Sequence, residues 1–349
     1  MLKWFRWILL PLGVLHLTAI QLRHIAYRFG FFKRRYLPVP VISVGNIQAG
    51  GTGKTPFVIL LLQQLQESGL RVGILSRGYG RQSEGILTFT TNGEQQPTAT
   101  TAGDEPIEIW PHITAGGMGI GADRYEAGMT LLETCQLDCI LLDDGLQHQR
   151  LGRDLDICLI DVSSWQFHPF LLPFSYLRDI KNKLRDVDWI ILNKWEAQPH
   201  KLTQIEPELA SYPANIKRAR FTFADITNLY GEKIKEKPMR VGMICGIANP
   251  QYFADMLSGA GYEIVWQKHF ADHHSYTNSE LLDVLELAKT AGAEQLITTE
   301  KDAVKIRPLL AGKSEQNKHF AIANLKIEVA DDRKLLQQII SIVGKSRSQ

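Results

Sequence analysis

Hydrophobic and polar positions alternate in two patterns along the chain from residue 38 onward. Short apolar runs that end in glycine or a polar residue are typical of strands buried on both faces. The longer segments between them have helical spacing, most clearly at 55–68, where Gly69 supplies a stop. Strands that alternate with helices predict right-handed βαβ units and a mostly parallel sheet with helices on both faces.

The pattern divides the chain into two α/β regions. In the first, we expect a helix at 122–134 and strands at 39–44, 71–76, 138–142, 156–161 and 188–192. In the second, we expect strands near 240–245, 262–267, 295–298 and 319–324. These elements predict a larger domain at 38–212, a linker or β-hairpin at 213–236 and a smaller α/β domain at 237–349.

The segment 1–37 differs from the rest of the chain in charge. It holds seven basic residues and no acid, so it carries +7 while the remaining residues carry −5. Residues 7–22 are uncharged and mostly apolar, but they are fewer than the ~20 residues that a spanning helix needs. We expect an amphipathic helix on an anionic membrane surface; a secretory signal and a helix packed on its own domain are the alternatives.

The overall composition is that of a folded protein. Hydrophobic residues make up 44% of the 349 positions and charged residues 22%, which excludes wholesale disorder and a polytopic membrane protein. The net charge of +2 does not fit a general nucleic-acid binder, so no nucleic acid is expected as a partner. The four cysteines form no CxxC pair, and we expect them to be reduced, as in a cytosolic protein.

A glycine-rich segment between the first strand and the first helix predicts a phosphate-binding loop. It consists of Gly50, Gly51, Thr52, Gly53, Lys54, Thr55 and Pro56. The glycines allow backbone N–H groups to turn toward phosphate oxygens, and the helix N-terminus adds a positive dipole end. In such a loop the lysine reaches the β and γ phosphates and the threonine hydroxyl can bind Mg²⁺. Gln48 stands where the usual pattern has its first glycine, and a chance GKT turn is the alternative.

Two acids, Asp143 and Asp144, end the apolar strand near 138–142. Downstream of a phosphate loop, an acid at a strand end is expected to approach Mg²⁺ directly or through water. Adjacent carboxylates repel each other unless a cation or hydrogen-bond donors satisfy them. The alternative is an aspartate that caps the following segment.

Four further segments carry candidate chemistry. Asp104 and Glu105 precede a proline in a loop, which is also common in ordinary turns. Adjacent histidines follow Asp272; they suit a base oriented by a carboxylate, or metal ligands for which no third ligand is evident. Arginines on glycine-flexible or loop segments are placed to bind an anion or to remain solvated: Arg77, Arg81 and Arg178.

The motifs GNIQAGGTGKTP, LSRGYG, GDEP, GADR, LLDDGLQH, CGIANP, FADHH and TTEKDAVK occur in this order between residues 45 and 305. With its basic N-terminus, the chain resembles the tetraacyldisaccharide 4′-kinase family of lipid A biosynthesis. The resemblance implies transfer of the ATP γ-phosphate to the 4′-hydroxyl of an acylated glucosamine disaccharide 1-phosphate, at the cytoplasmic face of the bacterial inner membrane. It also implies a P-loop NTPase-like domain and a smaller α/β domain with the active site between them.

The resemblance further implies roles for individual residues. Asp104 is the expected base and His273 its partner, with Asp272 beside it. The phosphate loop, both strand-end aspartates and Arg178 would bind ATP. Magnesium would be held by Thr55, Asp143, Asp144 and Glu105, and the lipid by Arg77, Arg81, Gln147 and His148.

The sequence departs from the family pattern at Asp179, which replaces glutamate, at Ala248, which replaces glycine, and at 174–176, where Phe-Ser-Tyr replaces a Gly-Pro. The first puts any nucleotide contact of this acid in question, and the second is expected to affect turn geometry only. For the segment 298–302 we expect a turn that caps the next helix.

Two other classes of protein share some of these features. A membrane-associated partition or maturation ATPase would also have GGxGKT, but such proteins usually carry lysine where this chain has Ala49. A nucleotide-gated binding protein without transfer chemistry would not need an acid at position 104, where this chain has aspartate.

Overall fold

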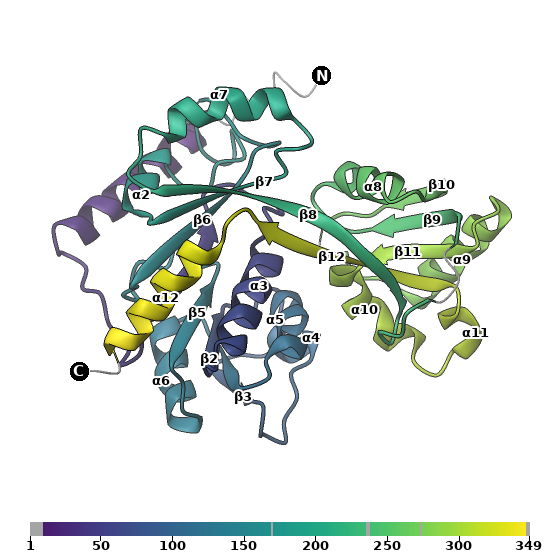
Figure 1. Cartoon of the computed structure of the whole chain (residues 1–349), viewed down its shortest axis with the longest axis horizontal. Helices are drawn as coiled ribbons and strands as arrows, with labels where there is room; N and C mark the ends of the chain where they lie inside the picture. The colour runs from purple at the N-terminus through teal and green to yellow at the C-terminus, as the bar shows by residue number, and fades with distance from the viewer. Residues whose placement is uncertain (1–9, 169, 235–237, 273, 347–349) are drawn as a thin grey trace.

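The computed structural model describes residues 10–168, 170–234, 238–272 and 274–346. The chain forms two lobes, of which the larger contains both ends of the described chain (Figure 1). Within these ranges, no helix combines the length and the apolar character that crossing a membrane requires.

One sheet of twelve strands runs through the described residues and connects the two lobes. Its strand order is β10-β9-β11-β12-β8-β7-β6-β1-β5-β2-β4-β3. The larger lobe holds β1 (Val41–Asn46), β2 (Val72–Ser76), β3 (Leu87–Thr90), β4 (Gly116–Ile120), β5 (Cys139–Asp143), β6 (Leu155–Asp161) and β7 (Trp189–Asn193). The smaller lobe holds β9 (Arg240–Cys245), β10 (Glu263–His269) and β11 (Gln295–Thr299), and the lobes share β8 (Asn215–Asn228) and β12 (Phe320–Val329).

The strand pairing confirms the predicted mostly parallel sheet. Neighbouring strands are parallel except in the pairs β3–β4 and β8–β12. The strand β1 lies between β6 and β5, so its carboxyl end is next to those of both neighbours. In a parallel sheet this edge collects the side chains that follow each strand, and ligands bind there.

Helices cover both faces of the sheet in the larger lobe. Alternate residues of β6 point to opposite faces: Ile157 packs in the cluster with α3 (Lys54–Glu67) and α12 (Arg333–Ser346). Cys158 instead packs in the cluster with α2 (Leu10–Arg28) and α7 (Pro199–Leu209). On this second face, α6 (Arg124–Thr134) covers β2 and β5. Buried on both sides, these strands have the continuous apolar runs seen in the sequence.

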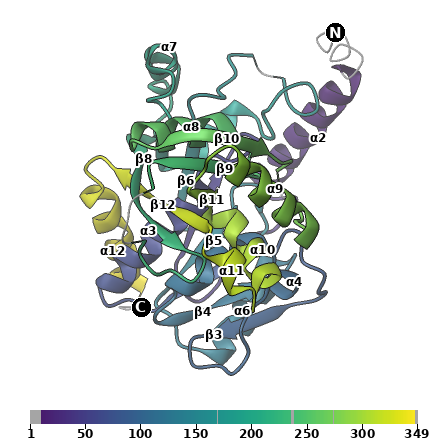
Figure 2. The same ribbon diagram turned by 90° about the vertical axis from the view of Figure 1, so that its right-hand side faces the viewer.

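The smaller lobe is also layered. The helix α8 (Pro250–Gly259) lies on one side of its strands, and α9 (Asn278–Thr290) and α10 (Glu300–Leu310) lie on the other (Figures 1 and 2). The short helix α11 (Ser314–Asn317) follows α10.

The segment expected as a linker or hairpin is mostly one long strand. The first part of β8 pairs with β7, and from Ala219 onward β8 pairs antiparallel with β12. In Figure 1 these two strands pass from one lobe to the other as a ribbon. After β12 the chain returns to the larger lobe, where Leu335, Ile339 and Val343 of α12 join the core beside α3. Among the described residues that follow the connector, α12 therefore packs with the larger lobe and not with the smaller one.

Several elements were not expected from the sequence. The strands β3 and β4, the short helices α4 (Ala99–Ala102) and α5 (Asp104–Ile109), and the 3₁₀ turns Trp110–His112 and Lys181–Asp186 lie in segments without a clear period. In β4 a Cβ on Gly119 would lie 2.9 Å from the Ala127 carbonyl oxygen of α6, so glycine lets this helix pack closely on the sheet.

Candidate active site

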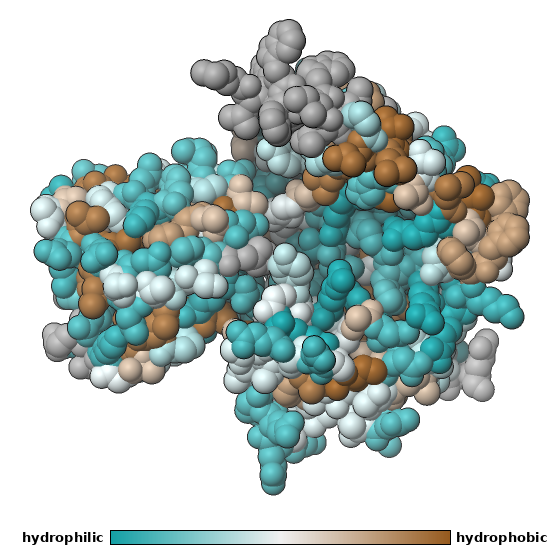
Figure 3. Space-filling model, turned by 180° about the vertical axis from the view of Figure 1, so that it is seen from behind, coloured by the Kyte–Doolittle hydropathy of each residue, from teal (hydrophilic) through white to brown (hydrophobic). Residues whose placement is uncertain are grey.

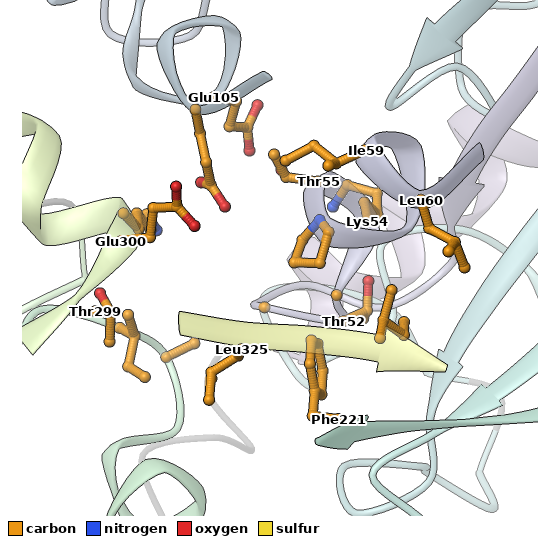
Figure 4. A pocket seen from close by; sticks show the side chains of 18 of the residues that line it. Thr52, Lys54, Thr55, Ile59, Leu60, Glu105, Phe221, Thr299, Glu300 and Leu325 are labelled. Carbon is orange, nitrogen blue, oxygen red and sulfur yellow. The ribbon is translucent and has the colours of Figure 1, made fainter. Parts of the chain in front are cut away.

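A cleft of about 1250 Å³ lies between the two lobes. It is lined by the phosphate loop and α3 on one side and by the start of α10 on the other (Figure 4). In this view Lys54 and Thr55 lie across the cleft from Glu300, while Glu105 enters from α5. The cleft therefore lies at the carboxyl edge of the sheet, as expected for a ligand site in an α/β fold.

The phosphate loop has the predicted position between β1 and α3. Gly53 adopts a left-handed conformation with φ 86° immediately before the helix begins at Lys54. A Cβ at this glycine would lie 2.4 Å from the Asn193 side-chain nitrogen, so glycine is required for two reasons. Asn46, at the end of β1, donates a hydrogen bond of 2.6 Å from its amide to the Thr52 hydroxyl.

Gln48, the departure from the usual loop pattern, is a fixed part of the structure. It is buried, and its amide nitrogen donates to the Asp161 carbonyl oxygen at 2.9 Å. Its amide oxygen accepts from the Asp161 backbone N–H, also at 2.9 Å. This paired contact ties the start of the loop to the end of β6, a role that glycine could not perform.

Two residues that the sequence analysis missed hold the phosphate loop through hydrogen bonds to its carbonyl oxygens. The Asn193 amide donates to the Thr52 carbonyl oxygen at 3.1 Å. The Lys194 ammonium donates to the Gly51 carbonyl oxygen and lies 3.0 Å from Asp161. Both residues are buried at the end of β7. Their donors therefore fix the Gly51 and Thr52 carbonyl oxygens, while within the loop the Thr52 N–H donates to the Gly50 carbonyl oxygen at 3.0 Å.

Asp144 lies at the centre of a network of ions. The Arg178 guanidinium donates to both of its carboxylate oxygens, one of them at 2.9 Å, and the Lys54 ammonium lies 3.7 Å away. Burial alone would raise the pKa of Asp144, but Lys54 and Arg178 hold it below its usual range. The structure thus brings together three of the residues predicted to act on ATP.

The neighbouring Asp143 has a different environment. It is buried, and the Ser76 hydroxyl reaches one of its oxygens at 3.5 Å. Its Oδ1 atom has no hydrogen-bond partner in the described structure. Burial raises the pKa of Asp143, and the nearby charges of Glu105 and Asp144 act in the same direction. A buried carboxylate of this kind is costly unless a cation or donor meets it.

These residues fit a magnesium ion held jointly with phosphates. In the described ranges no three His, Cys, Asp or Glu residues form a complete metal site. Magnesium in nucleotide sites is commonly held by one or two carboxylates together with substrate phosphates and waters. The unpartnered oxygen of Asp143 and the hydroxyl of Thr55, which lines the cleft, provide ligands of this type.

Asp104 is the first residue of α5, on the side of the larger lobe that faces α10. Gly103 before it has φ 93°, and a Cβ there would lie 2.6 Å from the Tyr79 carbonyl oxygen. The Asp104 carboxylate lies 2.9 Å from the ammonium of Lys305 in α10. Lys305 is a residue that the sequence analysis did not single out.

Asp272, which precedes the expected partner of Asp104 in the sequence, is in the loop after β10. Asp272 lines the cleft and accepts a hydrogen bond of 2.8 Å from Lys301. His273 lies outside the described residues, so its pairing with Asp104 stays a prediction. The next residue, His274, contributes its carbonyl oxygen, which accepts from Lys305 at 3.2 Å.

Of the residues predicted to bind the lipid, some line the cleft and one does not. Arg77, Gln147 and His148 line the cleft, whereas Arg81 donates to the Gly85 carbonyl oxygen of its own loop and is not among the lining residues. Burial lowers the pKa of His148 to about 4, and the charge of Arg124 contributes.

Arg124, in the GADR motif, is a further lining residue that received no role from the sequence. It is buried, and its Nε atom has no partner in the described part of the chain. Burial lowers its pKa, as does the positive charge of Arg77. Two neighbouring guanidinium groups at a cleft wall favour an anionic group of the substrate.

Asp179 does not face the nucleotide loop. It is fully buried and accepts hydrogen bonds from the Ile180 backbone N–H at 2.9 Å and from Gln147 at 3.3 Å. A ring nitrogen of His24 in α2 lies 2.9 Å from its carboxylate. The acid that replaces glutamate therefore connects the N-terminal helix to the loop after β5.

The 298–302 segment has the expected capping role. The Thr299 hydroxyl accepts from the Asp302 backbone N–H at 3.2 Å and so caps α10. Asp302 also accepts from the Gly246 backbone N–H at 3.0 Å. Ala248, two residues further along that loop, lies 3.6 Å from where a Cβ on Gly50 would stand, so this loop reaches the phosphate loop.

Comparison with known proteins gives consistent results across nearly the whole chain. A family profile described as tetraacyldisaccharide-1-P 4′-kinase matches residues 5–344. A tetraacyldisaccharide 4′-kinase of Shewanella frigidimarina is 36% identical over 334 residues, with 96% of this chain and 91% of the relative covered. One from Actinobacillus pleuropneumoniae serotype 5b is 35% identical over 342 residues, with 97% of each covered.

A solved structure is similar as well. The crystal structure of the "apo" form of LpxK from Aquifex aeolicus in complex with ATP aligns with a TM-score of 0.77 at 29% identity. The alignment covers 97% of this chain and 99% of that one.

Proposed function

Since the chain belongs to the tetraacyldisaccharide 4′-kinase family and is a kinase of lipid A biosynthesis, we propose that the cleft between its lobes carries out the phosphate transfer with Asp104 as base. ATP is the phosphate donor, and the 4′-hydroxyl of the tetraacyldisaccharide 1-phosphate is the acceptor. The alternative of a partition-type ATPase is not favoured by the relatives.

One observation carries the residue assignment. The groups that suit ATP phosphates lie on the larger lobe, and Asp104 stands at the boundary where that lobe meets α10 of the smaller one. In a loose phosphoryl-transfer transition state, catalysis depends mainly on positioning and on charge neutralisation. A base at the lobe boundary orients the sugar hydroxyl only when both lobes enclose the substrate, which limits transfer to water.

In this proposal Lys54 and the loop N–H groups neutralise the β and γ phosphates, and Arg178 holds Asp144 in place. The carboxylate of Asp104 accepts the proton of the 4′-hydroxyl as the oxygen attacks the γ-phosphorus. Thr55 and Asp143, with Asp144 and Glu105 near them, would hold Mg²⁺. Magnesium supplies further neutralisation of phosphate charge when it is bound.

For the lipid, we propose that its 1-phosphate is recognised at the wall formed by Arg77, Arg124, Gln147 and His148. All four residues line the cleft, and the positive charge of Arg77 contributes to the lowered pKa of Arg124. An imidazole with a pKa near 4 is neutral at physiological pH, so His148 would contribute a hydrogen bond and no charge.

We also propose that α2 attaches the protein to the cytoplasmic face of the inner membrane. Its side chains Leu12, Leu15 and Leu22 are more than half exposed, and the following Phe29 and Phe31 are exposed to 72% and 80%. Figure 3 shows hydrophobic surface gathered at the upper right of the molecule. Apolar side chains next to basic residues suit an interface with anionic headgroups.

These assignments give each segment of the chain a role. We propose a membrane-surface segment at 1–37, a P-loop kinase domain at 38–212 that α12 joins, a connector at 213–236 and a smaller domain formed by the rest of 237–349. The packing of α12 on α3 supports assigning this last helix to the kinase core.

The test of the base is transfer of ³²P from γ-labelled ATP to a purified acylated glucosamine disaccharide 1-phosphate in detergent. We expect label in the lipid with the unaltered protein and at least a ~10²-fold lower rate with Asp104→Asn, while ATP binding is retained. Activity of the variant within a few-fold of the unaltered protein would show that another group is the base.

A further inference from the structure

Lys305 makes the ion pair that joins the two lobes at the proposed base. We propose that Lys305 is a positioning residue for phosphate transfer: its ammonium holds the Asp104 carboxylate in a fixed orientation at the boundary between the lobes. This inference rests on the assignment of Asp104 as the base.

The contacts of Lys305 fix it in place. Its Nζ atom lies 2.9 Å from Oδ2 of Asp104 and donates to the His274 carbonyl oxygen at 3.2 Å. The Lys305 side chain is 11% exposed and that of Asp104 is 21% exposed. A pair so enclosed is screened much less by salt than a surface ion pair. The ammonium therefore has a defined position between the base and the loop after β10.

The geometry of α10 explains how a lysine of the smaller lobe reaches the base. The helix is capped at Thr299 and begins beside the cleft, so its first turns face α5. Lys301 and Lys305 are four residues apart and lie on the same face of the helix. Lys301 pairs with Asp272 of its own lobe at 2.8 Å, while Lys305 pairs with Asp104 of the other lobe.

Proton transfer to Asp104 is favoured when a neighbouring group orients its carboxylate. When the 4′-hydroxyl attacks, its O–H bond breaks and the proton moves to the Asp104 carboxylate, while the new O–P bond forms and ADP leaves with the electrons of the old bond. Lys305 gains and loses no proton. It restricts rotation of the carboxylate, and a base that is already oriented loses less entropy in the transition state.

Lys305 also makes the orientation of Asp104 depend on whether the cleft between the lobes is closed. His274 belongs to the same lobe as Lys305 but Asp104 belongs to the larger lobe, so the contact with Asp104 exists only while α10 lies against α5. Separation of the lobes would remove the ammonium from Asp104 and release the orientation of the base. Because of this ion pair, Asp104 is correctly oriented only when the cleft is closed.

The experiment is a double-mutant cycle with the full-length protein. We measure kcat, the KM for ATP and the Kd for ATP for Lys305→Met, Lys305→Arg, Asp104→Asn and Asp104→Asn with Lys305→Met. Lys217→Met is the matched control, because Lys217 makes a 2.8 Å ion pair with Asp331 and lies in the part of β8 that pairs with β7, outside α5 and α10. Thermal unfolding of each variant establishes that it is folded, and Lys305→Gln replaces Lys305→Met if the latter is not.

For Lys305→Met we expect kcat to fall by at least about tenfold, with the Kd for ATP changed by less than about threefold. Arginine should restore most of kcat because it keeps the ion pair. In the Asp104→Asn background, removal of Lys305 should lower kcat by less than about twofold further, because the two residues act as a unit. The Lys217→Met variant should match the unaltered protein.

Three results would overturn the proposal. They are an unchanged kcat in Lys305→Met, a loss confined to ATP affinity, and a full additional loss of kcat in the Asp104→Asn background. The third result would show that Lys305 acts independently of the base. An active Asp104→Asn variant would instead refute the base assignment itself, whatever Lys305→Met does.

Discussion

A ring nitrogen of His24 lies 2.9 Å from the carboxylate of Asp179, and this contact joins the N-terminal helix α2 to the residue that follows Arg178. Gln149, in the loop after β5, lies 2.9 Å from the other ring nitrogen of His24. The helix proposed to lie on the membrane is thus connected through side chains to the arginine that holds Asp144.

The first prediction concerns the pH dependence of stability at Asp179. Burial alone would raise its pKa, but contacts with His24, the Ile180 N–H and Gln147 hold it below its usual range; the charges of Arg178 and Lys183 are also near. Because the folded pKa is the lower one, this stabilisation is complete above about pH 5 and is lost as the pH falls below ~3.9 toward the folded value.

We therefore expect Asp179→Asn to lower the free energy of unfolding by about 1–3 kcal/mol at pH 7, because it leaves buried donors without their ionic acceptor. The difference from the unaltered protein should shrink below pH 4. Urea unfolding at both pH values measures it. A difference that grows on acidification would mean that the carboxylate is not stabilised in its ionised form.

The second prediction concerns the arginine at Asp144. Arg178 donates through two nitrogens to both oxygens of Asp144, and a lysine has no such fork. We expect Arg178→Lys to lower kcat by roughly 10–10²-fold, although the charge is kept. Steady-state kinetics with saturating ATP measures the effect, and Arg218→Lys is the control because Arg218 pairs with Glu206 at the surface. Equal rates for Arg178→Lys and the unaltered protein would show that charge alone suffices.

Features that depend on local sequence were predicted at their observed positions. Glycine requirements, strand ends and helix starts are local, so the phosphate loop and the strand-end aspartates were predicted at their observed places. The parallel sheet followed from runs of apolar residues buried on both faces. The strand β4 was missed because its three glycines weaken any strand signal.

Contacts between distant segments could not be predicted in the same way. Lys194 follows β7 and Lys305 lies inside a helix, and neither has a local pattern that distinguishes it from a solvated lysine. Their roles depend on the strand order and on the approach of the lobes, which bring them to Gly51 and Asp104. Arg81 was interpreted as an anion ligand or a solvated loop residue, and the contact that the structure shows, from its guanidinium to the Gly85 carbonyl oxygen, had no signal in the sequence.

The third prediction tests the support of the phosphate loop. Lys194→Met keeps most of the buried stem but removes the donor to the Gly51 carbonyl oxygen and leaves Asp161 without its cation. We expect the Kd for ATP to rise by about tenfold, because the loop loses its fixed geometry. Titration with a fluorescent ATP analogue measures this. Lys201→Met, which removes a donor to the Ser163 carbonyl oxygen outside the loop, should leave the Kd unchanged; an effect of equal size there would argue against a specific role.

The fourth prediction concerns the membrane. Leu15 and Leu22 of α2 are exposed to 67% and 61%, so replacing both with glutamate removes little buried contact from the fold. Two added negative charges on an apolar surface should reduce binding to anionic vesicles by at least about tenfold, because both hydrophobic insertion and charge attraction are lost. Sedimentation with vesicles of anionic and of neutral lipid measures binding, and the Kd for ATP should stay the same.

The matched control for this prediction is Leu287→Glu in α9, where the leucine is 51% exposed on the smaller lobe. A general effect of acidic substitutions would reduce vesicle binding in the control as well, whereas attachment through α2 predicts no change there. Binding of the α2 variant equal to that of the unaltered protein would mean that another surface holds the lipid bilayer. Loss of ATP affinity together with vesicle binding would instead indicate that the substitutions disturb the contact of His24 with Asp179 and, through it, the nucleotide site.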